Sequence, residues 1–503
     1  MAEQFPGAVL DLLDEAGDRP VFEHGDRVVT AAGLLASVRR VTRGLRAAGV
    51  RPGDGVALLL GVGPEAFAAV LAAHAVGARV VGVRPGLTEG QRHHLLVGTV
   101  YQVTDRPPGR AGERSGTVDA AGGTAGGRLG GPGAPDGTVL LLDDLLAAED
   151  DGIRPPVSAR PQDIARLIHT SGSTGVPKAC AQTYAAMTAA WAAHPDRWPP
   201  AIRELAPRLE RFLVFGTLAS QVMLEYGLLA LAAGGTLVTA DAPAFPDSLV
   251  RHRATGSVIT VARLTKLVAS VRARPVDLGA LRALMVSGSP VGAARLREAA
   301  DVLGPVVFHG YGQTETGMIS MATPHDEPGS LGVPPVELEV RDAEGRPVPP
   351  GTDGELFVRT PAQGCGYWGE PESTAEVFTD GWVRTRDIGH LDGEGRLWLT
   401  GRARDVIIVN ADVHYAGPVE RVLATHPAVA EAYVVAVPDD STGEAVHAFV
   451  VPAAGRAPDL GELRALVTAE LGGACAPTRL TPIEEVPLTA AGKPDKRRLA
   501  AGG

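Results

Sequence analysis

A short segment that ends in a lysine has the residue types needed to bind a phosphate group. An apolar start, Leu167-Ile168, leads into Thr170-Ser-Gly-Ser-Thr-Gly175 and then Val-Pro-Lys178. Glycines let backbone N–H groups approach a phosphate closely, hydroxyls add donors, and the lysine adds positive charge. A Ser/Gly-rich surface turn is the alternative. Because Lys178 is one of only four lysines in the chain, we interpret the segment as a phosphate loop, although Pro177 before the lysine rules out a Walker A loop.

Four further motifs follow along the chain. They are Tyr311-Gly-Gln-Thr-Glu-Thr-Gly317, Thr385-Arg-Asp-Ile-Gly389, Gly401-Arg-Ala-Arg-Asp405 and Pro487-Leu-Thr-Ala-Ala-Gly-Lys493. With the phosphate loop, and in this order, they resemble the motifs of the acyl-adenylate-forming superfamily, which includes acyl- and aryl-CoA synthetases, adenylation domains of nonribosomal peptide synthetases and luciferases. The chain looks most like an acyl-CoA synthetase. The resemblance implies that a carboxylic acid is activated with ATP and Mg²⁺ and that the acyl group is passed to coenzyme A.

The residues that would act on the reacting atoms follow from the charge that the reaction builds. When a carboxylate attacks the α-phosphate of ATP, negative charge grows on the phosphorus oxygens and on pyrophosphate, so cations and preorganised donors are needed. Lys493 is suited to bridge the two reacting groups, with a solvated tail lysine as the alternative. Thr174 and Glu315 offer hard oxygen ligands to Mg²⁺. The predicted catalytic residues are therefore Lys493, Glu315 and Arg402.

The nucleotide itself needs contacts to its ribose and its base. Asp387 can accept hydrogen bonds from the ribose hydroxyls, and Arg402 is a candidate for a ribose or phosphate contact. Tyr311 can stack on the adenine, although a lone tyrosine is more often part of a core. The full set of predicted nucleotide-binding residues is Thr170, Ser171, Gly172, Ser173, Thr174, Gly175, Lys178, Gly288, Ser289, Pro290, Gly310, Tyr311, Gly312, Gln313, Thr314, Asp387 and Arg402.

The acid is predicted not to be an α-amino acid. Adenylation domains for amino acids usually bind the amine with an aspartate directly after a phenylalanine, and here Gly216 follows Phe215. The neighbouring residues are small, which leaves volume for a bulky aryl, polycyclic or medium-to-long acyl acid. His309 is a weaker candidate, because a packed histidine is the commoner reading of one residue. The predicted acyl-site residues are Phe215, Gly216, Ser220, Ser287, His309, Gly310 and Gly317.

The fold is predicted to be α/β with two domains. Apolar runs at residues 56–60 and 79–83 flank a helical pattern at 64–76, which indicates parallel strands joined by a crossover helix. Residues 1–401 would form a large domain with parallel sheets that holds the nucleotide and acyl sites. Residues 402–503 would form a small mobile α+β domain that carries Lys493, with Asp405 as the hinge. The Gly/Pro-rich residues 104–137 read as a surface excursion rather than a ligand loop.

Composition excludes several classes of protein. The formal net charge of -11 argues against a nucleic-acid partner, which needs clustered Lys and Arg. Three cysteines do not make a disulfide framework and suit reduced thiols in a cytoplasmic protein. No segment is apolar enough to predict a membrane span, and the N-terminal sequence does not read as a signal peptide.

Two departures from the superfamily pattern leave alternatives open. Arg386 stands where the superfamily has glycine before the ribose aspartate, and Asn410-Ala411 replaces a Gly-Gly pair after the hinge. Neutral drift would explain both. A sharper hypothesis is an enzyme specialised for only one half-reaction, with a partner enzyme for the other. An adenylation enzyme that loads a carrier protein or an amine also stays open, as does a nucleotide-binding pseudoenzyme.

Overall fold

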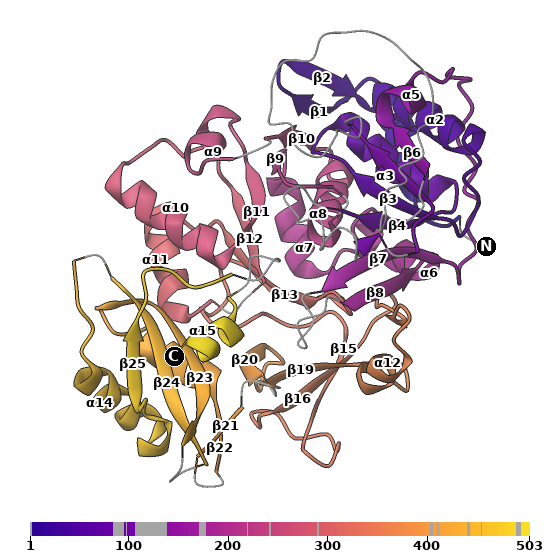
Figure 1. The fold of residues 1–503 in the computed structure, drawn as a ribbon. Coiled ribbons are helices and arrows are strands. Elements are labelled where there is room, and N and C mark those ends of the chain that lie inside the picture. The colour runs from indigo at the N-terminus through magenta and orange to yellow at the C-terminus, as the bar shows by residue number, and fades with distance from the viewer. Residues whose placement is uncertain are drawn as a thin grey trace. The chain divides into compact units, whose positions relative to one another are not determined.

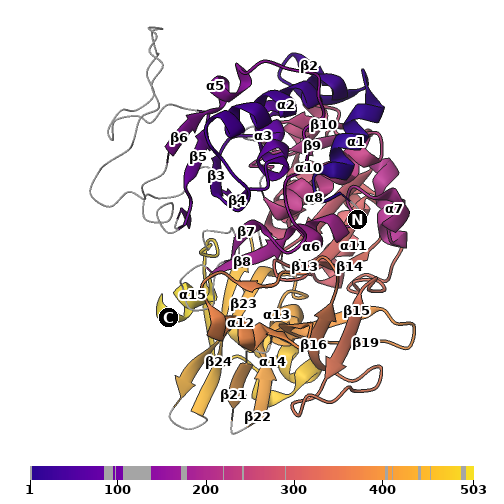
Figure 2. The same ribbon diagram turned by 90° about the vertical axis from the view of Figure 1, so that its right-hand side faces the viewer.

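The computed structural model describes most of the chain. The described residues are 3–83, 95–96, 98–105, 138–170, 178–218, 220–240, 243–288, 291–402, 406–409, 412–439, 443–453, 455–488 and 494–502. They divide into two compact units, of which unit 1 comprises Met1–Ile259, Ala269–Met285 and Pro361–Thr374, and unit 2 comprises Thr260–Val268, Val286–Thr360 and Ala375–Gly503. Figure 1 and Figure 2 show the elements of both units from two directions. No helix within the described ranges has the length and apolar character needed to cross a bilayer.

The first sheet of unit 1 has seven strands in the order β17-β8-β7-β4-β3-β5-β6. The strands from β7 to β6 run parallel to their neighbours, and β8 and β17 close the edge in the antiparallel direction. The predicted strand, helix, strand order is confirmed by β3, α3 and β4. The strands are β3 (Gly55–Leu59), β4 (Arg79–Gly82), β5 (Tyr101–Thr104), β6 (Thr138–Leu141), β7 (Ile164–Thr170), β8 (Lys178–Thr183) and β17 (Gly366–Tyr367).

Helix α3 (Pro64–Ala75) shows why this sheet forms a core. Proline stands at its first turn at Pro64, where a missing N–H costs no hydrogen bond. All residues from Phe67 to Ala75 are buried, as expected of a helix that is apolar on every side. Helix α3 lies beside α2 (Ala31–Ala47), as both ribbon views show. The buried faces of α3 therefore exclude water from its contacts with α2 and with the sheet.

A second sheet in unit 1 runs in the order β12-β11-β9-β10-β1-β2. Its strands are β1 (Pro20–His24), β2 (Arg27–Thr30), β9 (Arg211–Val214), β10 (Thr236–Thr239), β11 (Gly256–Thr260) and β12 (Ala283–Ser287). Further helices among the described residues of this unit are α1 (Gly7–Ala16), α5 (Leu142–Leu146), α6 (Tyr184–Ala189), α7 (Pro200–Leu205), α8 (Gln221–Ala232) and α9 (Asp247–Arg251), with short 3-10 turns η1 (Pro195–Arg197) and η2 (Ala206–Arg208). Helices α10 (Val261–Ala273) and α12 (Pro371–Val377) contribute residues to both units.

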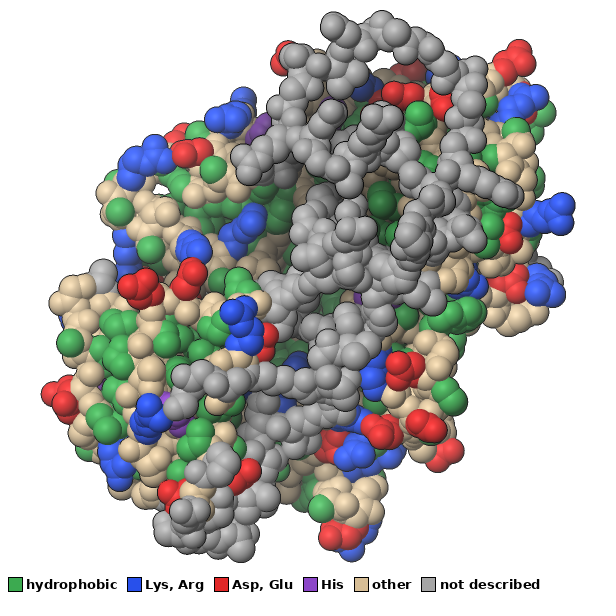
Figure 3. Space-filling view, in the orientation of Figure 1, with side chains coloured by type: hydrophobic (Ala, Val, Ile, Leu, Met, Phe, Trp, Pro, Cys, Tyr) green, Lys and Arg blue, Asp and Glu red, His purple; other side chains and the backbone are tan. Residues whose placement is uncertain are grey.

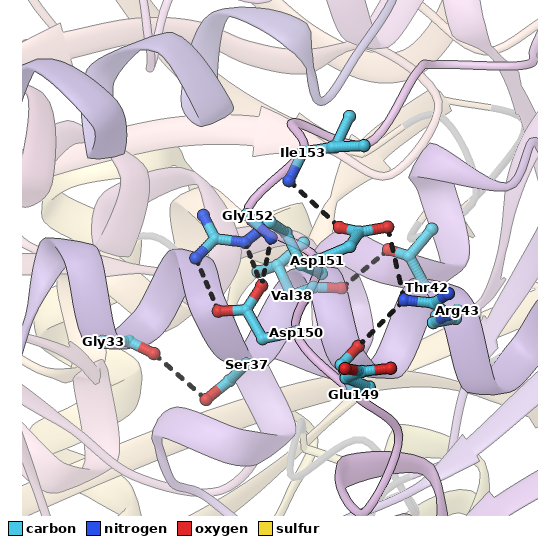
Figure 4. Close-up of polar contacts among 11 residues, drawn as sticks. Gly33, Ser37, Val38, Thr42, Arg43, Glu149, Asp150, Asp151, Gly152 and Ile153 are labelled. Carbon is cyan, nitrogen blue, oxygen red and sulfur yellow. Dashed lines mark hydrogen bonds and ion pairs between the residues drawn. The ribbon is translucent and has the colours of Figure 1, made fainter.

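The segment before β7 is held to α2 by charge. The Arg39 guanidinium donates to both carboxylate oxygens of Asp150, at 2.5 and 2.7 Å. One turn along the helix, Arg43 reaches Asp151 and the carbonyl of Glu149 (Figure 4). The Arg39 guanidinium holds the pKa of the Asp150 carboxyl at about 2, well below its usual range.

Charged side chains of both signs are interspersed over the face of the molecule shown in Figure 3.

Unit 2 contains two five-stranded sheets and a hairpin. The hairpin is β13 (Val307–Gln313) with β14 (Gly317–Ala322), and the first sheet runs β15-β16-β19-β18 with β20 also on β19. The strands of the sheet are β15 (Glu337–Arg341), β16 (Gly354–Arg359), β18 (Phe378–Thr379), β19 (Trp382–Leu391) and β20 (Leu397–Arg402), and α11 (Ala293–Leu303) precedes the hairpin.

The last hundred residues form the α+β arrangement that the sequence predicts. Helices α13 (Ala416–Leu423) and α14 (Leu460–Leu471) pack their buried residues Val419, Leu423 and Leu463 against the sheet. The sheet runs β22-β21-β24-β23 with β25 on β24. Its strands are β21 (Val406–Val409), β22 (Asp412–Tyr415), β23 (Val429–Asp439), β24 (Gly443–Pro452) and β25 (Arg479–Pro482), with η3 (Gly473–Cys475) before β25 and α15 (Lys496–Gly502) after it.

Candidate active site

The predicted phosphate loop connects two paired strands. Thr170 is the last residue of β7 and Lys178 the first of β8, and the two are partners in the antiparallel register. The loop residues Ser171, Gly172, Ser173, Thr174 and Gly175 lie outside the described residues. The ends of the loop are therefore held together by the antiparallel pairing of β7 with β8.

The side chain of Lys178 is held by a segment far away in the sequence. Its Nζ lies 2.5 Å from Ser373 Oγ and 5.4 Å from the centre of the Tyr367 ring. Glu370 Oε2 is 3.9 Å from the same nitrogen and accepts a hydrogen bond from Ser373 at 3.0 Å. The sequence analysis did not single out Ser373, Glu370 or Tyr367. A rare lysine beside the loop was the only signal that a partner should exist.

Asp387 is the centre of the best-defined polar network in unit 2. Its Oδ2 accepts from the hydroxyl of Tyr311 and from Nε2 of Gln313, both at 2.6 Å. Its Oδ1 accepts from Nε of Arg402 at 2.8 Å, and the residue is 2% exposed. Burial holds the pKa of the Tyr311 phenol well above its ordinary value and the Asp387 carboxylate adds to the shift, so this hydroxyl remains a donor. Four of the predicted nucleotide residues are thus brought together.

Three strands position this network. Tyr311 and Gln313 come from β13, Asp387 from β19, and Arg402 from β20, where it is the register partner of Asp387. Gly312 lies between the first two, and a Cβ at this position would collide with the carbonyl of Gly317 across the hairpin. The motif Tyr-Gly-Gln therefore needs its glycine so that the hairpin can close.

The network has the chemistry to receive a ribose. The Arg402 side chain is 57% exposed, so the contact on Oδ1 of Asp387 is the one that an incoming hydroxyl can replace or join. A carboxylate accepts hydrogen bonds and ribose hydroxyls donate them. Stacking of Tyr311 on the adenine stays a prediction. What the structure gives this buried side chain is a hydrogen bond from its hydroxyl to Asp387.

Magnesium binding would depend on few protein ligands. Glu315 lies half-buried in the turn between β13 and β14, and Thr174 lies outside the described residues. Across the described ranges, no group of three or more His, Cys, Asp or Glu side chains gathers as a metal site. A single carboxylate fits Mg²⁺, since this ion keeps several waters and is bound through one or two carboxylates plus substrate phosphates.

The predicted acyl-site residues of unit 1 follow β9. Gly216 has φ +79, and apart from Gly216 and its two chain neighbours, no described residue has an atom within 4 Å of the place that a Cβ would occupy. Phe215 packs edge-on against Phe245, with ring centres 5.9 Å apart. Ser220 caps α8, because its Oγ accepts from the N–H of Met223 at 3.3 Å. The Ser220 hydroxyl is therefore already used as the N-cap of this helix.

The predicted residues of unit 2 lie mostly on the strand that carries Tyr311. His309 and Gly310 are buried on β13, and Gly317 begins β14 with φ +72. Ser287 is half-buried at the end of β12. Gly288 has φ +97. Thr314 lies in the β13–β14 turn; Ser289, Pro290, Asp405 and Lys493 lie outside the described residues.

Comparison with known proteins gives matches over most of the chain. Residues 12–368 match the family model described as AMP-binding enzyme, and residues 418–493 match AMP-binding enzyme C-terminal domain. A feruloyl-CoA synthase of Amycolatopsis sp is 35% identical over 480 residues, which cover 93% of this chain and 93% of that protein.

Solved structures agree with these matches. Amide bond synthetase McbA from Marinactinospora thermotolerans has a TM-score of 0.82 at 31% identity, with 99% of both chains covered. The o-succinylbenzoate coenzyme A synthetase from Bacillus subtilis, in complex with ATP and magnesium ion, has a TM-score of 0.79 at 26% identity, again with 99% of both chains covered.

Proposed function

Because the chain belongs to the AMP-binding enzyme family, we propose that it activates a bulky carboxylic acid other than an α-amino acid and passes the acyl group to coenzyme A. It is an AMP-forming acid–thiol ligase that uses ATP, Mg²⁺ and coenzyme A. A carboxylate oxygen of the acid attacks the α-phosphorus of ATP and pyrophosphate leaves. The thiol sulfur of coenzyme A, having lost its proton, then attacks the acyl carbon, and AMP leaves. The arrangement around Asp387 is the observation that carries the nucleotide part of this proposal.

The roles of single residues are part of the proposal. Asp387 accepts from the ribose hydroxyls, while Tyr311 and Gln313 keep its carboxylate in place through hydrogen bonds of 2.6 Å. Arg402 then turns from Asp387 towards the ribose or a phosphate. Lys493, on the proposed small domain of residues 402–503, stabilises the charge of the adenylation transition state. Magnesium, when bound, neutralises phosphate charge, and Glu315 and Thr174 are its proposed protein ligands.

The class of acid is supported by the backbone at Gly216. A side chain at this position would have to adopt φ +79, which L-residues rarely do. An aspartate that binds an α-amino group is absent here, and the backbone conformation favours the glycine that is present. The space that the described residues leave beside Gly216 is available to the substrate, which favours a bulky acid. The likeness over 93% of the chain to a feruloyl-CoA synthase supports an aromatic acid as the first class to test.

An amine is the second candidate acceptor. The amide bond synthetase McbA resembles the chain over 99% of its length at 31% identity. In addition, Asn410-Ala411 stands where the superfamily pattern has two glycines. Loading of a carrier protein, and division of the two half-reactions between partners, remain further alternatives to coenzyme A.

Two separate assays test the proposal. Acid-dependent exchange between ATP and pyrophosphate, run over a panel of aryl, polycyclic, acyl and amino acids, reports adenylation. Mass spectrometry of products from synthetic acyl-AMP, with coenzyme A, an amine or a phosphopantetheinylated carrier protein, reports the acceptor. We expect exchange with a bulky non-amino acid and a coenzyme A thioester of the same acid. Exchange only with α-amino acids would refute the proposed substrate class, and amide without thioester would favour the second candidate.

A further inference from the structure

Arg386 occupies a backbone conformation that suits glycine. Its φ is +61, and only Arg253 and Asp380 share a positive φ among the non-glycine residues in the described ranges. For an L-residue with a side chain this region is disfavoured by roughly five- to thirtyfold in population. Asparagine and aspartate tolerate it better than arginine does, because their short side chains can hydrogen-bond locally. Something in the surroundings must therefore hold Arg386 there.

An ion pair reaches Arg386 from outside its own strand. Nη2 of Arg386 lies 2.6 Å from Oε2 of Glu376, which is on helix α12. The Arg386 side chain is only 19% exposed, whereas that of Glu376 is 63% exposed. An exposed ion pair contributes little by itself. Here, however, the Arg386 side chain is largely shielded from solvent.

The restrained residue lies directly before the ribose carboxylate. Arg386 lies within β19, where the register with β16 shifts between Arg384 and Ile388 as in a β-bulge, and the N–H of Asp387 donates to Oγ1 of Thr385 at 3.1 Å. Oγ1 of Thr385 in turn donates to the buried carbonyl of Leu356 at 2.8 Å. If Arg386 left the left-handed region, this bulge would change shape and the Asp387 carboxylate would move relative to Tyr311.

We propose that the Arg386–Glu376 ion pair positions Asp387 for the nucleotide by holding residue 386 in its left-handed conformation. This inference rests on the proposed function, because it takes Asp387 to be the ribose contact. Arg386 and Glu376 are positioning residues in this scheme and need not touch the nucleotide. A chain with glycine at position 386 would reach the same conformation without any ion pair, so Glu376 matters only because Arg386 is present.

A double-mutant cycle tests this dependence. Glu376→Gln should raise the Kd for AMP and the KM for ATP about two- to fivefold, as expected from the loss of a partly shielded pair, with little change in kcat. Arg386→Gly should bind AMP about as tightly as the wild type. The double variant should match Arg386→Gly, because glycine needs no anchor. Binding of AMP by calorimetry is the primary readout, and the KM-to-kcat split is the second.

A matched control lies on the same helix. Glu372 is exposed and makes no ion pair with another residue in the part of the chain that the structure describes, so Glu372→Gln should leave AMP binding unchanged. The inference is overturned if Glu376→Gln binds AMP as the wild type does. It is also overturned if Glu376→Gln weakens binding equally in the wild-type background and in the Arg386→Gly background. Absence of AMP binding by the folded wild type would instead overturn the proposed function, and the inference with it.

Discussion

Replacing Glu225 by glutamine should make the stability of unit 1 less sensitive to pH. Glu225 lies on α8 and lines a cavity of ≈ 30 Å³ whose other walls include Phe5, Leu224 and Arg166. Burial raises the pKa of the Glu225 carboxyl to about 7, and Arg166 opposes this shift only in part. Arg166 uses its Nε to donate to Gln182 at 2.6 Å. The folded protein therefore binds a proton at Glu225 that the unfolded chain does not hold at neutral pH.

The sign and size of the effect follow from this shift. Because the folded pKa is raised, the stabilising contribution is fully present below the usual carboxyl pKa of 4.5 and is lost as the pH rises to about 7. A shift of this size corresponds to about 3 kcal/mol as an upper value. The cavity has room for about two water molecules, which would solvate the carboxylate, so we expect about 1 to 3 kcal/mol. Because glutamine does not ionise, Glu225→Gln should not lose this folding stability above pH 7.

Urea unfolding at pH 5 and pH 8.5 measures the effect. The midpoint of Glu225→Gln should rise relative to the wild type at pH 8.5 by more than it does at pH 5. His194 and Glu3 also line the cavity, but both variants share them; burial lowers the pKa of His194, and hydrogen bonds from Arg154 lower that of Glu3. Glu15→Gln, an exposed carboxyl on α1, is the matched control. Parallel pH curves for the wild type and Glu225→Gln would refute the reasoning.

Three further substitutions test the proposed site. Asp387→Asn should weaken the proposed charge-assisted contacts to the ribose, so KM for ATP should rise about tenfold or more. An unchanged KM in a folded variant would remove Asp387 from the nucleotide site. In the proposed mechanism the charge of Lys493 serves only the first step, so Lys493→Ala should slow pyrophosphate exchange about 100-fold or more while thiolation of supplied acyl-AMP persists. Normal pyrophosphate release would exclude Lys493 from the mechanism. Asp405→Pro restricts φ at the proposed hinge and should impair one half-reaction more than the other; equal losses in a folded protein would argue against a hinge there.

Several features could be predicted from the sequence because their causes are local. The order β3, α3, β4 follows from apolar runs, a proline at a first helical turn and helical periodicity within residues 56–83. The Tyr311 motif likewise carries its reason in neighbouring residues, since Gly312 lets the hairpin close. The family could be recognised for the same cause, because each of its motifs is a short stretch of chain.

Partners that are distant in sequence could not be predicted. Tyr311 and Asp387 are separated by 76 positions, and Lys178 and Ser373 by 195. A composition or a motif does not set which of many hydroxyl groups a lysine will meet. That choice depends on strand register, such as the pairing of Asp387 with Arg402 across β19 and β20.

By itself, the sequence determined the α/β class, the family and the residue types available for acid activation. Only the tertiary structure decided that Arg386 takes a left-handed conformation beside Glu376, and that Glu225 lies in a cavity that raises its pKa. The physical reason is the same in both cases. Hydrogen-bonding motifs and apolar periodicity act over a few residues, whereas backbone strain, burial and charge pairing depend on which remote segments the fold packs together.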